Sequence, residues 1–221
     1  MVKIKIIRHS QRLDFTKPWW WIFYFGHYWS DSPLTSKGHE MAEQRAIQIS
    51  KSGFNPKYIY TSPYTRTMAT AVEIGKQFPT AQVLLEPLIS EYQAVDHAQH
   101  KYDVVGHIQN LFISKHRTSI YPNGIPTTCE GVETKFKYPE TYESFCERVE
   151  YIIEKLAERH DDDLILVTHG EFIKSYVNHI QKMYPELILD IGKAPYLVTL
   201  TFEYDKLDKK IVQDSIKIET F

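Results

Sequence analysis

The segment Leu164 to Thr168 is apolar at nearly every position and is followed directly by a histidine, a glycine and an amphipathic helical pattern. A short strand of this kind is typical of a parallel sheet that is covered on both faces. The same order of strand and then helix recurs after Val2 to Ile7 and after Tyr58 to Thr61. This alternation predicts an α/β fold in which a mainly parallel sheet carries helices on both faces.

Four helices are expected from capping residues and from the spacing of apolar side chains. One begins after Thr35, a typical capping residue, and another after Ser62, whose hydroxyl would cap a helix with Pro63 as its first residue. The clearest amphipathic stripe predicts a helix from about Thr141 to about Glu158, and a fourth helix follows Gly170.

The C-terminal part predicts two further strands, Tyr196 to Tyr204 and Ile211 to Ile218, which a polar turn joins into an antiparallel edge pair. The length of 221 residues and the absence of a linker predict one domain over residues 1–221. The stretch from about 91 to 138 has no clear periodicity. We expect it to be an excursion beside the sheet, either a lid or a binding wall.

Composition excludes several classes of protein. The chain has 26 Lys plus Arg against 28 Asp plus Glu and no long run of one sign, so nucleic acid is not an expected partner. Lys3 and Lys5 interrupt the N-terminal apolar residues, which argues against a signal peptide, and the run Trp19 to Phe25 is far shorter than the roughly 20 residues of a membrane span. Cys129 and Cys146 are expected to be free thiols. These features predict a cytoplasmic protein without stable membrane insertion.

Positively charged side chains and imidazoles gather where the predicted strands end. His9 and His169 each close a strand, Arg8 and Arg12 lie beside His9, and Arg66 lies in the first turn after another strand. Ligands of α/β sheets bind beyond the carboxyl ends of the strands. Arginine forks bind phosphate oxygens bidentately, and a neutral imidazole can attack phosphorus. With no obvious acidic counterpart, this set predicts a phosphate site that needs no metal or cofactor.

Several histidines and the aromatic segment have more than one interpretation. Taken alone, a histidine at a strand end is more often a satisfied polar residue than a catalytic one. His97, His100 and His107 suggest a metal site, but without a carboxylate or cysteine at ligand spacing a solvated loop is favoured. The segment Pro18 to Trp29 holds all four tryptophans and is either a packed hydrophobic flap or a wall that stacks against substrate, with contact to a membrane surface as a third interpretation.

The order of the motifs resembles the histidine phosphatase superfamily, also called phosphoglycerate mutase-like. The Arg-His-x-x-Arg pattern followed by Leu13, Asp14 and Phe15 is most similar to the branch of the suppressor of T-cell receptor signalling (TULA) phosphatases and ecdysteroid-phosphate phosphatases. Five blocks stand in the family's order: Ile6–Arg12, Pro33–Thr35 with Gly38, Tyr60–Pro63 with Arg66, Leu88–Glu91 and Val167–Gly170.

The resemblance implies a phosphoglycerate mutase-like fold and a metal-independent phosphatase that acts on phosphate monoesters through a phosphohistidine intermediate. In such an enzyme His9 is the nucleophile, Glu91 is the proton donor, and His169 with three arginines holds the phosphoryl group: Arg8, Arg12 and Arg66. The implied substrate is a phosphorylated small molecule or a phosphotyrosine protein, with bulky or aromatic esters favoured. Relatives in this branch often dimerise, so a homodimer is a further expectation.

Two positions depart from the family pattern and keep alternatives open. Ser10 stands where glycine is usual, and Gln11 stands where this branch commonly has an acidic residue. A side chain at position 10 would lie where the backbone approaches the phosphate, which allows a catalytically weakened, phosphate-binding module. A phosphoglycerate mutase or sugar bisphosphatase is a third reading, which the Arg12 pattern disfavours.

Overall fold

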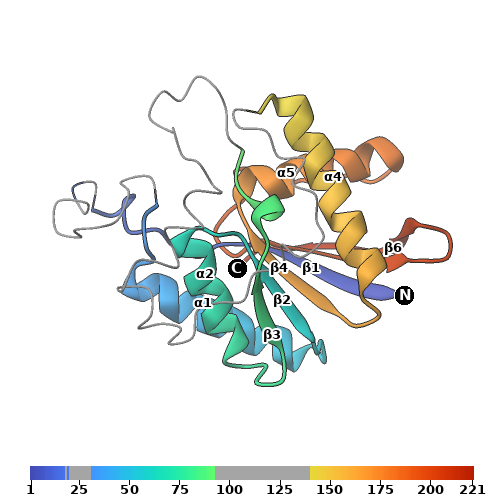
Figure 1. The fold of residues 1–221 in the computed structure, drawn as a ribbon. Helices are drawn as coiled ribbons and strands as arrows, with labels where there is room; N and C mark the ends of the chain where they lie inside the picture. Colours follow the sequence, from blue (N-terminus) through green and yellow to red (C-terminus); the bar gives the residue numbers. More distant parts are fainter. Residues whose placement is uncertain (18, 20–30, 93–139) are drawn as a thin grey trace.

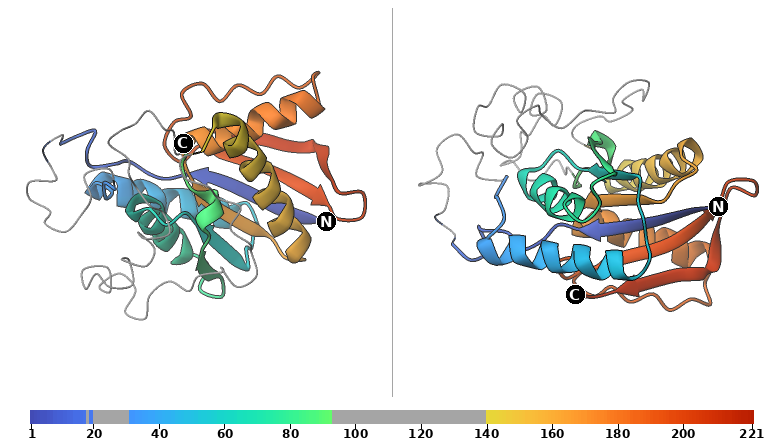
Figure 2. Two further views of the ribbon diagram at one scale, coloured as in Figure 1. Left: turned by 45° about the horizontal axis from the view of Figure 1, so that its top comes forward. Right: turned by 90° about the horizontal axis from the view of Figure 1, so that it is seen from below.

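The computed structural model describes residues 1–17, 19, 31–92 and 140–221, and the structural statements below concern these residues. Their strands form one sheet in the order β3-β2-β4-β1-β5-β6 (Figure 1). The bounds are β1 Val2–Arg8, β2 Tyr58–Thr61, β3 Gln82–Leu85, β4 Leu164–Thr168, β5 Thr199–Asp205 and β6 Lys210–Glu219. The pairs β1–β4, β4–β2 and β2–β3 are parallel, whereas β5 runs antiparallel to β1 and β6 antiparallel to β5. Figure 2 (left) shows these last two strands beside β1. The expected α/β fold with an antiparallel C-terminal pair is confirmed.

Helices cover the sheet in two groups, which lie on opposite sides of it in Figure 1. Their bounds are α1 Ser36–Lys51, α2 Thr65–Gly75, α4 Tyr142–Arg159 and α5 Gly170–Met183, with a short 3₁₀ helix, η2, at Pro87–Ile89. Alternate strand residues explain the two groups, because successive side chains point to opposite faces. Leu164 and Leu166 pack in one hydrophobic cluster with α4 and α5, and Ile165 and Val167 pack in the other with α1 and α2. Every residue of β4 is buried, as its apolar sequence predicts.

The starts of two helices agree with the expected caps. The Thr35 hydroxyl accepts a hydrogen bond from the Gly38 amide at 2.8 Å, and α1 begins at the next residue after Thr35. In the same way, Thr141 caps α4 by accepting from the Ser144 amide at 3.1 Å.

The expected start of α2 is wrong. The helix begins at Thr65, so Pro63 is not its first residue and the Ser62 hydroxyl does not cap it. The cap comes from Asp31, a fully buried residue whose carboxylate accepts from the Thr65 amide and from the Thr65 hydroxyl, both at 2.7 Å. The Ser62 hydroxyl bonds His169 instead, which explains why it is not available to the helix.

The start of β5 is the second correction. The strand begins at Thr199 and not at Tyr196, because Leu197 adopts a φ of 60° and the Val198 amide closes a turn onto the Pro195 carbonyl at 3.1 Å. A positive φ is incompatible with an extended strand. The strand β3 and the helix η2 are not expected from the sequence, because they are too short to show a period.

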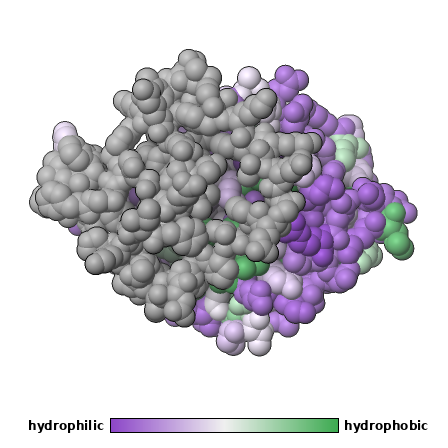
Figure 3. Space-filling view, viewed as in Figure 1, coloured by the Kyte–Doolittle hydropathy of each residue, from purple (hydrophilic) through white to green (hydrophobic). Residues whose placement is uncertain are grey.

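Several expectations fall on residues outside the described part of the chain. These are the three histidines 97, 100 and 107, Cys129, nearly all of the excursion, and the aromatic segment apart from Trp19, which is 68% exposed. Within the described part Cys146 is a free thiol, as expected. None of the described helices is long and apolar enough to cross a membrane. The described surface visible in Figure 3 is mainly hydrophilic.

Candidate active site

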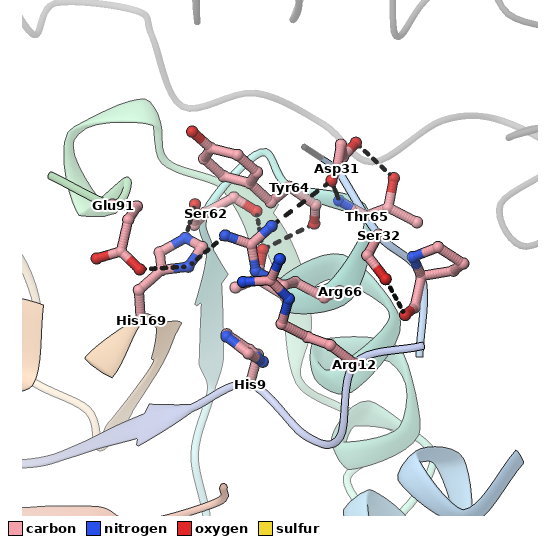
Figure 4. A network of polar contacts seen from close by, with 12 residues as sticks. His9, Arg12, Asp31, Ser32, Ser62, Tyr64, Thr65, Arg66, Glu91 and His169 are labelled. Atoms are coloured by element: carbon pink, nitrogen blue, oxygen red, sulfur yellow. Dashed lines mark hydrogen bonds and ion pairs between the residues drawn. The ribbon is translucent and has the colours of Figure 1, made fainter. Parts of the chain in front are cut away.

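The candidate site lies at the carboxyl ends of the parallel strands. In the β1–β4 pair Arg8 lies opposite Thr168, and the His9 amide donates to the Thr168 carbonyl at 2.9 Å. This register places the His9 and His169 rings side by side, with centroids 5.6 Å apart. Arg12 and Arg66 approach the same point (Figure 4). The two histidines predicted to meet therefore do meet.

His9 is held in the form that a nucleophile requires. Its Nδ1 lies 2.8 Å from the Ser10 carbonyl oxygen. A carbonyl can only accept, so Nδ1 carries the proton and the lone pair of the neutral ring is on Nε2. The ring is 1% exposed, and burial, together with the charges of Arg66 and Arg8, holds the pKa of His9 well below its ordinary value of 6.5. His9 is therefore a neutral imidazole at neutral pH.

His169 is fixed by three neighbours. Arg66 donates from Nη2 to Nδ1 at 3.2 Å, and on the other side Nε2 lies 2.8 Å from the Ser62 hydroxyl. Because a guanidinium only donates, Nδ1 is the acceptor and Nε2–H donates to Ser62. The Tyr64 ring packs edge-on against the imidazole at 4.9 Å. Burial, Arg66 and His9 lower the pKa of His169 well below 6.5, so this ring is also neutral.

Two guanidiniums of the site, one buried and one half-buried, lie over tyrosine rings. Arg66 is 3% exposed and lies 4.3 Å from the centroid of Tyr64. Arg8 lies 4.7 Å from the centroid of Tyr196 and donates to the Ala194 carbonyl. The left-handed backbone at Ala194, with a φ of 47°, belongs to the same loop that ends before β5. That loop therefore fixes the position of Arg8.

The expectation that the guanidiniums lack acidic counterparts is wrong. Arg12 forms a bidentate pair with Asp14, in which Nε donates to Oδ1 at 3.0 Å and Nη2 contacts Oδ2. Asp31 lies 4.0 Å from Arg66 Nη1. Both side chains of the Arg12–Asp14 pair are about one-fifth exposed. Asp14 thus fixes the orientation of the Arg12 fork.

Glu91 places a carboxyl group beside His169. Its Oε2 lies 3.6 Å from His169 Nδ1, and its side chain is 28% exposed. This contact is not an ion pair, because His169 is neutral. Desolvation in the pocket raises the pKa of Glu91 above 4.5, against the opposing charge of Arg66. The raised pKa favours a protonated carboxyl, as a proton donor requires.

The two departures from the family pattern point away from this pocket. The Ser10 hydroxyl is fully buried and donates to the Gly38 carbonyl at 2.7 Å. The Gln11 side chain accepts from the Thr35 hydroxyl at 2.7 Å, at the start of α1. A Cβ on Gly38 would lie 2.5 Å from the Gln11 carbonyl oxygen, so this close approach requires glycine. Both side chains tie the loop that follows His9 to the start of α1. Neither of them fills the space beside the His9 ring.

We expect Ser10→Gly to leave kcat/KM within about threefold of the parent enzyme, because the hydroxyl does not face the substrate. The same change removes a buried hydrogen bond and adds backbone freedom, so the free energy of unfolding should fall by about 1–2 kcal/mol. Steady-state kinetics with p-nitrophenyl phosphate and denaturant unfolding measure the two effects. A tenfold gain in kcat/KM on conversion to glycine would show instead that Ser10 weakens catalysis.

Four residues that support the described site are not expected there from the sequence: Asp31, Ser62, Tyr64 and Tyr196. Ser62 precedes a proline, a pattern typical of a helix cap, and nothing local relates it to His169. Asp31 lies 34 residues from the amide that it caps, and the tyrosines act through ring contacts, so no local spacing could have revealed them. Within the ranges that the structure describes, no group of three His, Cys, Asp or Glu residues is placed to hold a metal ion.

The chain matches a known protein family. Residues 6–214 match the histidine phosphatase superfamily (branch 1). An uncharacterized phosphoglycerate mutase family protein of Acanthamoeba polyphaga mimivirus is 50% identical over 219 residues, which cover 99% of this chain and 98% of the viral protein.

Similar solved structures share the fold at low identity. The ecdysone phosphate phosphatase of Bombix mori, in complex with tungstate, has a TM-score of 0.62 at 17% identity, covering 100% of this chain and 95% of that one. A phosphoglycerate mutase of Bacillus anthracis has a TM-score of 0.56 at 17% identity, covering 100% and 92%. The expected class, a phosphoric monoester hydrolase of the histidine phosphatase type, is confirmed at the level of the family. With a match over nearly its whole length, the chain belongs to the histidine phosphatase superfamily.

Proposed function

We propose that this protein is a metal-independent phosphatase that hydrolyses phosphate monoesters through a phosphohistidine formed on His9. One observation carries the proposal. A neutral imidazole with its lone pair on Nε2 lies among three guanidiniums and a second neutral imidazole: Arg8, Arg12, Arg66 and His169. Such a set neutralises and orients a phosphoryl group without repelling the nucleophile.

In the first step Nε2 of His9 attacks phosphorus, a P–N bond forms, and the P–O bond to the leaving group breaks. The leaving oxygen takes the proton of the Glu91 carboxyl. Positive charge develops on the attacking ring, and the Ser10 carbonyl that accepts from Nδ1–H stabilises it. The three arginines hold the phosphoryl oxygens throughout.

In the second step water attacks phosphorus and the Glu91 carboxylate accepts its proton. The P–N bond breaks, and its electron pair returns to Nε2. Inorganic phosphate leaves, and His9 and Glu91 regain the protonation states in which they began. Each proton released in one step is thus returned in the other, so the cycle closes without a cofactor.

Aromatic or bulky phosphate esters are the proposed substrate class. The Tyr196 ring lies 5.9 Å from the His9 ring, and the Tyr64 ring lies against His169. Aromatic rings beside a phosphate site offer rigid apolar area for a flat leaving group. Together with the Arg12-x-Asp14 pattern, this supports assignment to the branch of the TULA and ecdysteroid-phosphate phosphatases.

A substrate panel tests the class. It compares a phosphotyrosine peptide, a steroid phosphate and p-nitrophenyl phosphate with 3-phosphoglycerate and fructose 2,6-bisphosphate, and uses His9→Ala as the blank. We expect higher kcat/KM values for the phosphotyrosine peptide, the steroid phosphate and p-nitrophenyl phosphate than for the other two compounds. Preference for 3-phosphoglycerate or the bisphosphate would favour the mutase or sugar bisphosphatase reading.

We expect EDTA to leave kcat unchanged within about twofold, because every step uses groups of the protein and none needs a metal to activate water. Initial rates before and after dialysis against EDTA, with and without added Mg²⁺ or Zn²⁺, provide the measurement. A strict requirement for an added divalent ion would contradict the mechanism.

A further inference from the structure

We propose that Arg148, on α4, is the positioning residue that holds Glu91 at the reaction centre. The inference rests on the proposed role of Glu91 as the proton donor. Arg148 donates hydrogen bonds to Glu140 and to backbone carbonyls of residues 88–91. It acts through the backbone of the segment that carries Glu91.

One buried guanidinium binds three carbonyls of this segment. Arg148 Nη1 donates to the Leu88 carbonyl at 2.5 Å and to the Ser90 carbonyl at 3.2 Å, and Nη2 lies 3.5 Å from the Glu91 carbonyl. The remaining carbonyl, that of Ile89, accepts from the Thr168 hydroxyl at 2.6 Å. All four carbonyls from 88 to 91 are therefore engaged by side chains of α4 and β4.

The opposite edge of the guanidinium is held by Glu140. Arg148 Nε and Nη2 donate to the two carboxylate oxygens at 3.0 and 2.7 Å, and the two side chains are only 6% and 2% exposed. A bidentate, buried pair fixes the plane of the fork. One side chain thus links the segment 88–91 to Glu140, which lies just before the start of α4.

The rate contribution of a proton donor depends more strongly on its exact position than that of a charged group that binds phosphate. The Glu91 carboxyl stands 3.6 Å from His169 Nδ1, and its path to the leaving oxygen depends on where its backbone lies. Loosening this segment would misplace the carboxyl while His9 and the arginines stay in place. The effect should therefore fall on substrates that need a proton donor.

Arg148→Lys is the first test. A lysine keeps the charge opposite Glu140 but cannot span the carboxylate and three carbonyls at once. We expect kcat/KM for an alkyl phosphate to fall on the order of 10- to 100-fold, the cost of a small misplacement, while p-nitrophenyl phosphate changes by less than about threefold. If the role of Arg148 were purely structural, kcat/KM would fall by the same factor for both substrates.

Arg45→Lys is the matched control. Arg45 is also buried and binds backbone carbonyls, those of Leu197 and Glu219 at 3.2 and 2.9 Å, but it contacts nothing on the Glu91 segment. Arg45→Lys should change kcat/KM for the alkyl phosphate and for p-nitrophenyl phosphate by the same factor. If Arg148→Lys fails to fold, the paired change Arg148→Met with Glu140→Met removes both charges without stranding either, and the same selective loss is expected.

Comparison with Glu91→Gln separates the inference from the proposed function. If Arg148 acts only through Glu91, the combined variant Arg148→Lys/Glu91→Gln should be no worse on the alkyl phosphate than Glu91→Gln alone. Selective loss in Glu91→Gln with equal losses, or none, in Arg148→Lys would overturn the positioning role and leave the donor intact. Equal losses in Glu91→Gln itself would overturn the donor assignment and, with it, the role of Arg148.

Discussion

His9→Ala is expected to lower kcat/KM for p-nitrophenyl phosphate on the order of 10⁴-fold or more, the scale of loss when a covalent nucleophile is removed. The reason is geometric. His9 presents an unprotonated Nε2 at the meeting point of β1 and β4, and the other neutral ring, His169, has its two nitrogens committed to Arg66 and Ser62. Neither nitrogen of His169 is therefore free to replace the nucleophile.

The loss must be separated from unfolding. Inorganic phosphate should still bind to His9→Ala, because the arginines remain, and should still raise its melting temperature. His39→Ala is the matched histidine control, since His39 lies on α1, is 43% exposed and pairs with Glu73. It should keep full activity. Comparable activity in His9→Ala and the parent enzyme would contradict the role of His9.

Glu91→Gln should lower kcat/KM for an alkyl phosphate by about 10²- to 10⁴-fold, the usual contribution of general acid catalysis, and p-nitrophenyl phosphate much less. The amide cannot supply a proton to a basic leaving oxygen, whereas p-nitrophenolate leaves without one. Glu143→Gln, on the exposed first turn of α4, is the matched control. Equal losses on both substrates would argue against the donor role.

The pH profile gives the same assignment a second readout. Glu91 acts while protonated, and its pKa is raised above 4.5, so activity on the alkyl phosphate should fall as pH rises through that raised pKa. His9 must be neutral, and its lowered pKa means that acid inactivation should begin only well below pH 6.5. Comparing the parent enzyme with Glu91→Gln on one substrate cancels ionisation of the substrate itself. An alkaline limb that persists unchanged in the variant would exclude Glu91 as its source.

The sequence predicted those parts of the site that depend on strand ends. His9 and His169 could be brought together because the carboxyl ends of parallel strands meet at one edge, and Arg66 could be placed because it lies in the first turn after β2. These positions follow from local patterns and one rule of topology.

The supporting contacts could not be predicted, because each joins segments that no local pattern relates. Asp31 caps a helix 34 residues away, and Arg148 binds a carbonyl at a separation of 60 residues. Ser62 shows the same limit in another form, since a hydroxyl before a proline is typical of a helix cap and only the position of β4 directs it to His169. Tertiary placement, and not residue type, assigns these side chains.

Trapping the intermediate tests the central claim most directly. The enzyme is mixed with a phosphate ester whose phosphoryl group is radiolabelled, and the reaction is quenched in alkaline denaturant within the first turnover. The protein is then digested so that the labelled peptide can be identified. We predict one labelled peptide, containing His9, with a phosphoryl group that is stable in base and released in acid, and no label in His9→Ala. Turnover without any such adduct, or an acid-stable label on another residue, would contradict the account.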